Sequence, residues 1–309
     1  MGTGEFAVPS LAALVRAGHG VSMVVSQPDR PQGRGLTLHE TPVKKLAFSL
    51  GLKVFQPEKL RLDPNPVIEE NADILVVVAY GQILRENILA CAPRGAVNVH
   101  ASLLPKYRGA APIQWAIANG ETRTGVTTMQ LDRGMDTGPM LLQEECAIDP
   151  LDTTATLEPR LADIGAALLL RTLDGLRDGT VTATPQDNTQ ATLAPLIKKN
   201  DGLLDFHQPA AGIANRLRGF SPWPGVQIHH AGRSLKLINA SATALRTAEP
   251  PGTLLSATRE GVDVACGEGT VLRIERVQPE SRGATAAFDF VNGARLRPGS
   301  ILGASVANA

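Results

Sequence analysis

The chain has few cysteines, few aromatic residues and no net charge. Its three cysteines, Cys91, Cys146 and Cys266, are isolated and odd in number. This argues against a disulfide framework or a C-x-x-C zinc site and fits a reducing compartment. With 30 Lys and Arg against 30 Asp and Glu, the formal net charge is +0. Whole-chain electrostatics therefore do not indicate a nucleic-acid binder, and any RNA contact must use a local basic patch.

Long apolar runs are also missing. No run reaches membrane-spanning length, and the N-terminus does not read as a signal peptide. We therefore expect a soluble, cytoplasmic protein without a membrane partner. The 309 residues, 43% hydrophobic and 19% charged, have an ordinary globular composition and suffice for two domains, each with its own core.

The stretch from Gly95 to Gly138 carries most of the information about chemistry. Residues 95–100 form a short apolar run interrupted by Asn98 and ended by His100, which is typical of a buried parallel strand. Because side chains alternate along a strand, Asn98 and His100 should share one face near its carboxyl end, where open α/β sheets bind ligands. Asp136 follows in the turn RGMDTG. Together these side chains offer an oxyanion donor and proton carriers.

The residues alone leave a second interpretation open. An Asn-x-His is usually a pair of hydrogen-bonded polar residues at a strand end, and an Asp-x-Gly is usually a turn. The loop SLLPKYRGAAPIQ (102–114) favours a functional site, because no packing requirement demands its mixture of proline, glycine, basic and apolar residues.

The N-x-H, SLLP and D-x-G motifs resemble the family of formyltransferases that use 10-formyltetrahydrofolate. The forms GAAPIQW (109–115) and GMDTG (134–138) resemble the branch that acts on methionyl initiator tRNA, and the resemblance covers almost the whole chain. It implies formyl transfer from 10-formyltetrahydrofolate to the α-amino group of methionyl initiator tRNA, for translation initiation. It implies a folate co-substrate and no metal, and we expect a monomer.

The resemblance also assigns roles to residues. Asn98 and His100 would stabilise the oxyanion, and Asp136 would hold His100 and an ordered water that relay protons. Folate contacts are expected from Ser102, Leu103, Leu104, Pro105, Tyr80, Gly81 and Ile83, and tRNA contacts from Arg30, Arg34, Arg108, Lys198 and Lys199. By composition alone, the loop with Arg30 and Arg34 is a solvated connector, and the lysine doublet is a solvated pair.

The sequence departs from the family's pattern at a few places. Ala101 stands where the family usually has Gly, Gly4 where it has Pro, and Leu36-Thr37 where a lysine pair is common. Relatives carry a short apolar strand before the segment that begins here at Met1. We therefore expect the first, central strand of the sheet to be absent from this sequence, which would expose two strand edges.

The alternation of strands and helices predicts an α/β fold with a Rossmann-like, mostly parallel sheet over residues 1–180. Helices are predicted at 9–15, 43–50, 111–119, 154–177 and 209–218, and an antiparallel edge strand at 140–148. A linker is predicted at 181–200. Five short strands in 201–309 predict a small OB-like β-barrel. The resemblance to the family implies that this domain binds tRNA.

Other functions stay open on the sequence. One is formylation of a nucleotide sugar or glycinamide ribonucleotide by a related enzyme. Another is an RNA-binding module on an inactivated scaffold, which the joint presence of Asn98, His100 and Asp136 disfavours. Formylation of free methionine is a third, although two domains would be more than it needs.

Overall fold

The computed structural model describes residues 1–32 and 37–303 and divides into two compact units. The first unit comprises Met1–Ile113, Arg123–Ile148 and Thr156–Pro195, and the second comprises Gln114–Thr122, Asp149–Ala155 and Leu196–Ala309. The division after Pro195 falls inside the segment 181–200 that we predicted to be a linker.

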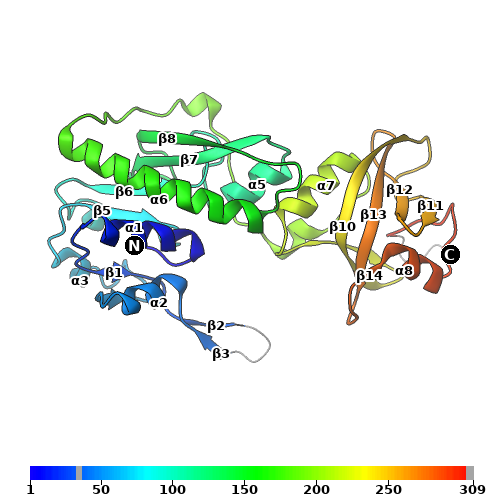
Figure 1. Ribbon diagram of the computed structural model, residues 1–309, viewed down its shortest axis with the longest axis horizontal. Coiled ribbons are helices and arrows are strands. Elements are labelled where there is room, and N and C mark those ends of the chain that lie inside the picture. The colour runs from blue at the N-terminus through cyan, green and yellow to red at the C-terminus, as the bar shows by residue number, and fades with distance from the viewer. Residues whose placement is uncertain (33–36, 304–309) are drawn as a thin grey trace. The chain divides into compact units, whose positions relative to one another are not determined.

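The first unit is organised around a sheet whose strands lie in the order β5-β6-β7-β8 (Figure 1). These strands are β5 (Leu75–Val78), β6 (Ala96–His100), β7 (Arg123–Gln130) and β8 (Met140–Ala147). β5 and β6 are parallel, whereas β6–β7 and β7–β8 are antiparallel. The predicted antiparallel edge strand at 140–148 is confirmed as β8. The carboxyl end of β6 carries His100, as the apolar pattern predicted.

Met1 and Gly2 lie beside β5, and Gly2 also bonds to β1 (Val24–Val25), which pairs in parallel with β4 (Val54–Phe55). The Gly2 amide donates to the Val25 carbonyl at 2.9 Å, and the Val78 amide donates to the Met1 carbonyl at 2.9 Å. The Met1 amino group donates to the Val76 carbonyl at 2.7 Å. Two residues thus bridge the strands at the place where we expected a longer strand to be absent.

Helices α1 (Val8–Arg16), α2 (Pro42–Ser49), α5 (Pro112–Ala118) and α6 (Thr154–Asp178) form at the predicted helical segments 9–15, 43–50, 111–119 and 154–177. Most of α5 belongs to the second unit. The α6 helix runs along one face of the sheet (Figure 1). A Cβ at Gly165 of α6 would press against Val99, and Thr172 of α6 shares a buried 2.7 Å hydrogen bond with Thr128. Since Val99 faces α6, Asn98 and His100 project from the opposite face.

Shorter elements complete the first unit. They are the 3₁₀ helix η1 (Glu5–Ala7), helices α3 (Asn65–Ile68) and α4 (Glu86–Leu89), the hairpin strands β2 (Arg30–Gln32) and β3 (Thr37–His39), and the 3₁₀ helix η2 (Asn188–Gln190).

The second unit contains an antiparallel sheet in the order β11-β12-β13-β10-β9. The strands are β9 (Val226–His230), β10 (Arg233–Arg246), β11 (Leu254–Thr258), β12 (Gly261–Ala265) and β13 (Thr270–Pro279). Among the described pairings, β9 and β11 at the two ends do not join, so the sheet is open and the predicted closed barrel is not found. The η3 turn (Lys199–Gly202), α7 (Ala210–Gly219), β14 (Thr285–Ala286) and α8 (Ala287–Gly293) complete this unit.

The hydrophobic core of the second unit contains residues from helices α7 and α8 as well as from the sheet. Ile213 and Leu217 of α7 and Val291 of α8 are buried in one cluster with strand residues such as Leu237 and Ile274. The helix predicted at 209–218 is confirmed as α7, whereas α8 and β14 were not predicted. The sequence predicted only short strands in this unit, yet β10 extends through Arg246 because β-bulges keep its irregular second half paired with β13.

Candidate active site

His100 and Asp136 face each other at the carboxyl end of β6. Nδ1 of His100 lies 3.6 Å from Oδ2 of Asp136, and their side chains are only 6% and 15% exposed. Nε2 of His100 lies 2.9 Å from the Tyr107 carbonyl oxygen. A carbonyl can only accept, so Nε2 carries a proton and donates it. Nδ1 is therefore the ring position available for proton exchange with the Asp136 carboxylate.

The turn after β7 presents the Asp136 carboxylate in an unusual backbone conformation. Asp136 has a φ of 54°, in the left-handed region that non-glycine residues seldom adopt. Its Oδ2 accepts a 2.8 Å hydrogen bond from the Gly109 amide. The carboxylate is thereby tied to the loop that follows β6, and its second oxygen remains available for a solvent molecule or a substrate proton.

Asn98 lies two residues before His100 on the same face of β6. It is 9% exposed, and no hydrogen bond within the described residues engages its side-chain amide. A nearly buried amide with unused donors can stabilise negative charge that develops on a substrate oxygen, because no solvent reorganisation is needed. Asn98, His100 and Asp136 thus combine a hydrogen-bond donor with a proton-transfer pair.

The loop of the predicted folate contacts, 102–105, is built tightly against β7. The side chain of Ser102 is fully buried, and its hydroxyl donates to the Lys106 carbonyl at 2.7 Å. Leu104 is 3% exposed, and its backbone bonds to the side chains of Thr127 and Gln143. The structure therefore leaves Leu103 and Pro105, which are half-buried, with more side-chain surface for a ligand.

The turn of residues 80–83 divides into buried and exposed parts. Tyr80 is 2% exposed and packs in an apolar cluster with residues such as Leu60 and Ile88, and burial raises the pKa of its hydroxyl to about 12. Gly81 has a φ of 83°, and a Cβ there would collide with Gln27. Ile83 is 88% exposed. Of these three predicted folate contacts, Ile83 and the Gly81 backbone present surface to a ligand.

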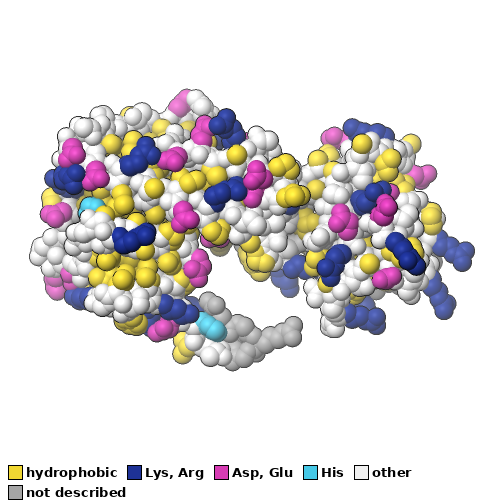
Figure 2. Space-filling view, in the orientation of Figure 1, with side chains coloured by type: hydrophobic (Ala, Val, Ile, Leu, Met, Phe, Trp, Pro, Cys, Tyr) yellow, Lys and Arg dark blue, Asp and Glu magenta, His cyan; other side chains and the backbone are white. Residues whose placement is uncertain are grey.

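The basic residues predicted to contact tRNA lie in different settings. Arg30, at the start of the β2–β3 hairpin, is exposed and pairs with Glu58 at 3.1 Å. Arg34 lies outside the described residues. Lys198 and Lys199 are exposed beside the η3 turn. On the face shown in Figure 2, Lys and Arg are interspersed with Asp and Glu over both units, as the net charge of +0 predicts.

Arg108 differs from the other basic residues because it is 7% exposed. Its guanidinium donates to Gln186 Oε1 at 3.0 and 2.7 Å and to Asn188 Oδ1 at 2.8 Å. Gln186 in turn donates from Nε2 to the carbonyls of Asp136 and Gly138. Sequence reasoning missed Gln186, since it lies in a Thr- and Pro-rich segment without apolar periodicity, and it missed the backbone groups of Tyr107 and Gly109.

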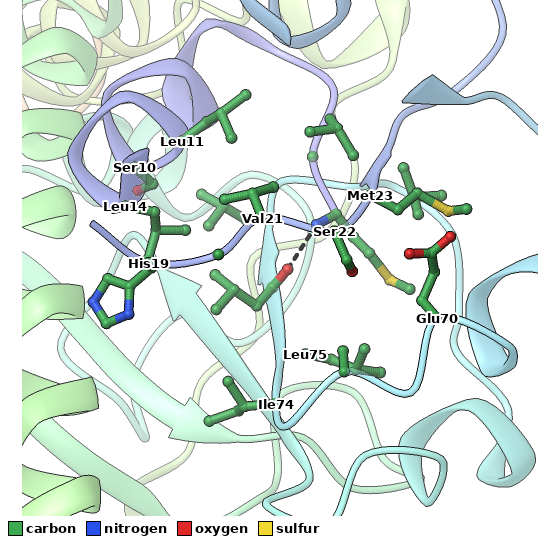
Figure 3. Close-up of a pocket in the computed structure, with 18 of the residues that line it drawn as sticks. Ser10, Leu11, Leu14, His19, Val21, Ser22, Met23, Glu70, Ile74 and Leu75 are labelled. Atoms are coloured by element: carbon green, nitrogen blue, oxygen red, sulfur yellow. Dashed lines mark hydrogen bonds between the residues drawn. The ribbon is translucent and has the colours of Figure 1, made fainter. Parts of the chain in front are cut away.

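A cavity of about 380 Å³ lies elsewhere in the first unit, between α1 and the strands beside Met1. Figure 3 shows Leu11 and Leu14 of α1 on one side of it and Ile74 and Leu75 on the other. It is lined mainly by apolar side chains, and Asn98, His100 and Asp136 are not among its lining residues. It is therefore separate from the candidate active site.

Two further classes of feature are missing from residues 1–32 and 37–303. No helix there is long and apolar enough to cross a membrane. No group of three or more His, Cys, Asp or Glu side chains there is placed to hold a metal ion.

Comparison with known structures gives the fold. A solved N-formyltransferase from Helicobacter canadensis, in complex with folinic acid and dTDP-3-aminofucose, is 19% identical with a TM-score of 0.66. The alignment covers 90% of this chain and 97% of that one. A sugar 3N-formyltransferase, WlaRD, also has a TM-score of 0.66 at 18% identity, with 91% and 97% of the two chains covered. At such identities the likeness establishes the fold alone.

Sequence comparison is more specific. The formyl transferase family matches residues 1–173, and its C-terminal domain matches residues 196–295. The methionyl-tRNA formyltransferase of Solibacter usitatus is 51% identical over 306 residues, which cover 98% of this chain and 97% of the relative. That of Koribacter versatilis is 49% identical over 305 residues, with the same coverage. Matches of this extent show that the chain belongs to the formyl transferase family.

Proposed function

We propose that the protein transfers the formyl group of 10-formyltetrahydrofolate to the α-amino group of methionyl initiator tRNA, for translation initiation. The observation that carries the proposal is the juxtaposition of Asn98, His100 and Asp136 in a chain about half identical to enzymes named for this activity. A folate donor suits the family, and one relative of the same fold has folinic acid bound.

Formyl transfer requires a donor for the negative charge that develops on the formyl oxygen and groups that move protons from the attacking amine to the leaving nitrogen. Bound 10-formyltetrahydrofolate supplies the electrophilic carbon. The free amide of Asn98 donates to the developing oxyanion from the open face of β6. His100 Nδ1 and the Asp136 carboxylate hold and pass the proton, while the Tyr107 carbonyl fixes the other ring nitrogen. The mechanism needs no covalent enzyme intermediate.

We assign the substrate contacts to those predicted residues whose side chains or backbone are accessible. Ile83, the Gly81 backbone, Leu103 and Pro105 offer the accessible surface for the folate, and Ser102, Leu104 and Tyr80 shape it from beneath. For the tRNA we propose contacts from the exposed Arg30, Lys198 and Lys199 and from Arg34, since Lys and Arg side chains bind phosphates. The C-terminal unit then acts as an OB-like tRNA-binding domain in a monomeric, cytoplasmic enzyme.

The test is formyl transfer from 10-formyltetrahydrofolate measured with three acceptors in parallel. These are methionyl initiator tRNA, free methionine and an amino-sugar nucleotide. The proposal expects fast, specific transfer to the aminoacyl-tRNA. Preference for the sugar nucleotide would move the protein to another branch of the family, and transfer to free methionine at an equal rate would remove the need for tRNA contacts.

A further inference from the structure

Gln186 connects two segments that the active site needs. Its Nε2 donates to the carbonyl of Asp136 at 2.8 Å and to that of Gly138 at 2.7 Å. Its Oε1 accepts from Nε and Nη2 of Arg108. Both ends of one amide are thus used at once, and the orientation of the amide is fixed because a guanidinium can only donate and a carbonyl can only accept.

Arg108, which orients the Gln186 amide, is itself held by several hydrogen bonds. Arg108 is buried, and its guanidinium also donates to Asn188 Oδ1. Its backbone pairs with the same segment, since the Arg108 amide donates to the Thr192 carbonyl at 2.9 Å and the Ala194 amide donates to the Arg108 carbonyl at 2.7 Å. Residues 186–194 are therefore fastened along the loop that follows β6.

The turn around Asp136 has a backbone conformation that depends on hydrogen bonds from other segments. Asp136 keeps a φ of 54°, and such strain persists only where the surroundings over-determine the conformation. The two bonds from Gln186 end on the carbonyl oxygens of Asp136 and Gly138, the residues before and after Thr137, and the first of these residues carries the carboxylate that faces His100. A turn released from these bonds would relax and alter the distance between the carboxylate and the imidazole.

We propose that Gln186, oriented by the buried guanidinium of Arg108, is a positioning residue that fixes the Asp136 turn and so holds the Asp136 carboxylate against His100. This inference rests on the proposed function, because it assigns Gln186 a part in the same proton transfer. It also gives Arg108 a role inside the protein in place of the tRNA contact expected from the sequence.

The most selective variant is Gln186→Glu. It keeps the length of the side chain and an acceptor for Arg108, but it removes the two donors and sets a carboxylate against the Asp136 and Gly138 carbonyls. Gln190→Glu is the matched control, since Gln190 is exposed in the same segment and bonds to Asp187. We expect a roughly 10- to 100-fold lower kcat for Gln186→Glu, because small misplacements of catalytic groups have effects of this size. The KM values for both substrates and the thermal midpoint should remain near those of the unsubstituted protein.

A double-mutant cycle with Asp136→Asn separates positioning from a general structural effect. If Gln186 acts through the Asp136 carboxylate, adding Gln186→Glu to Asp136→Asn lowers the single-turnover rate little further. The pH dependence of kcat should also change shape in Gln186→Glu and not in Gln190→Glu. Fully multiplicative losses in the cycle, or an unchanged rate and pH profile in Gln186→Glu, would overturn the inference.

The cycle also distinguishes this inference from the proposed function. An inactive unsubstituted protein would contradict the proposed function itself, whereas an Asp136→Asn variant with full activity would contradict the role of the Asp136 carboxylate and with it this inference. An active protein that loses activity in Asp136→Asn but tolerates Gln186→Glu contradicts only the role of Gln186. Circular dichroism of each variant shows whether it is folded, and Gln186→Met provides a second, uncharged replacement if the glutamate variant does not fold.

Discussion

The Nδ1 atom of His100 lies 3.6 Å from Oδ2 of Asp136, while the opposite ring nitrogen donates to the Tyr107 carbonyl at 2.9 Å. The imidazole is therefore held from one side and presented to a carboxylate on the other. The gap to the carboxylate is longer than a hydrogen bond, and catalytic hydrogen bonds of this kind often tighten only when substrate is bound.

Replacing the carboxylate by an amide should remove the proton-transfer function without changing the shape of the site. We expect Asp136→Asn to lower kcat by about 10²- to 10⁴-fold, the usual contribution of general acid–base catalysis. Affinity for the tRNA should be retained. Asp174→Asn, on the exposed side of α6, is the control. Steady-state kinetics and filter binding would measure the two effects, and a near-normal rate would remove Asp136 from the mechanism.

The Asn98 amide can be tested in the same assay. Asn98→Ala removes the proposed oxyanion donor, and the loss of one such donor costs about 10²- to 10³-fold in kcat. Asn98→Asp should be at least as damaging, because it places negative charge where negative charge develops. A wild-type rate in the alanine variant would show that another group stabilises the oxyanion.

Arg30 and Arg34 should affect the salt dependence of the reaction. Arg30→Ala and Arg34→Ala should each weaken the use of charged tRNA and reduce the slope of log kcat/KM against log salt by about 0.7 to 0.9. The exposed Arg16, at the end of α1, supplies the control substitution. Rates measured between low and physiological salt would give the slopes, and slopes equal to that of the control would indicate a solvated connector.

Tyr80 provides a test of the folate contacts. Its hydroxyl is buried and has no hydrogen-bond partner among residues 1–32 and 37–303, so Tyr80→Phe should leave stability unchanged or raise it by up to about 1 kcal/mol. The KM for 10-formyltetrahydrofolate should not change. Urea unfolding and steady-state kinetics measure the two quantities. A several-fold rise in that KM would show that the hydroxyl reaches the ligand.

In a protein sample whose chain begins at Met1, the Met1 amino group should make stability depend on pH. Burial lowers its pKa from 8.0 to about 5, so the unfolded chain binds the proton more tightly than the folded one. Stability is then fully present above about pH 8 and is lost as the pH falls toward 5, with an upper limit of about 4 kcal/mol. Urea unfolding at several pH values, compared between protein that begins at Met1 with a free and with an acetylated amino group, isolates this contribution. If the free energy of unfolding depended on pH in the same way in both proteins, the predicted contribution of the amino group would be contradicted.

The regular parts of the fold were predictable because they have a simple period. The apolar face of α1 and the buried run ending at His100 each indicated an element that the structure contains. The second half of β10 and helix α8 were not predictable, since bulges and tertiary packing override local periodicity there.

For the site, sequence reasoning reached the side chains that carry motifs but not the groups that hold them. Gln186 lies 50 residues from Asp136, and neither its spacing nor its neighbours indicate the contact. The resemblance assigned Arg108 to the tRNA, and only the fold shows that its guanidinium is buried and bonded to Gln186. The sequence motif assigned Tyr80 and Ile83 to the folate alike, and only the structure shows that Ile83 is exposed whereas Tyr80 is buried.

The most direct test of the central claim is the formylation of methionyl initiator tRNA by the purified protein with 10-formyltetrahydrofolate, with Asp136→Asn assayed in parallel. We predict rapid, donor-dependent formation of formyl-methionyl-tRNA that falls by at least about 10²-fold in the variant. Absence of the product in both, or equal rates in both, would contradict the assignment of this activity to the Asn98, His100 and Asp136 site.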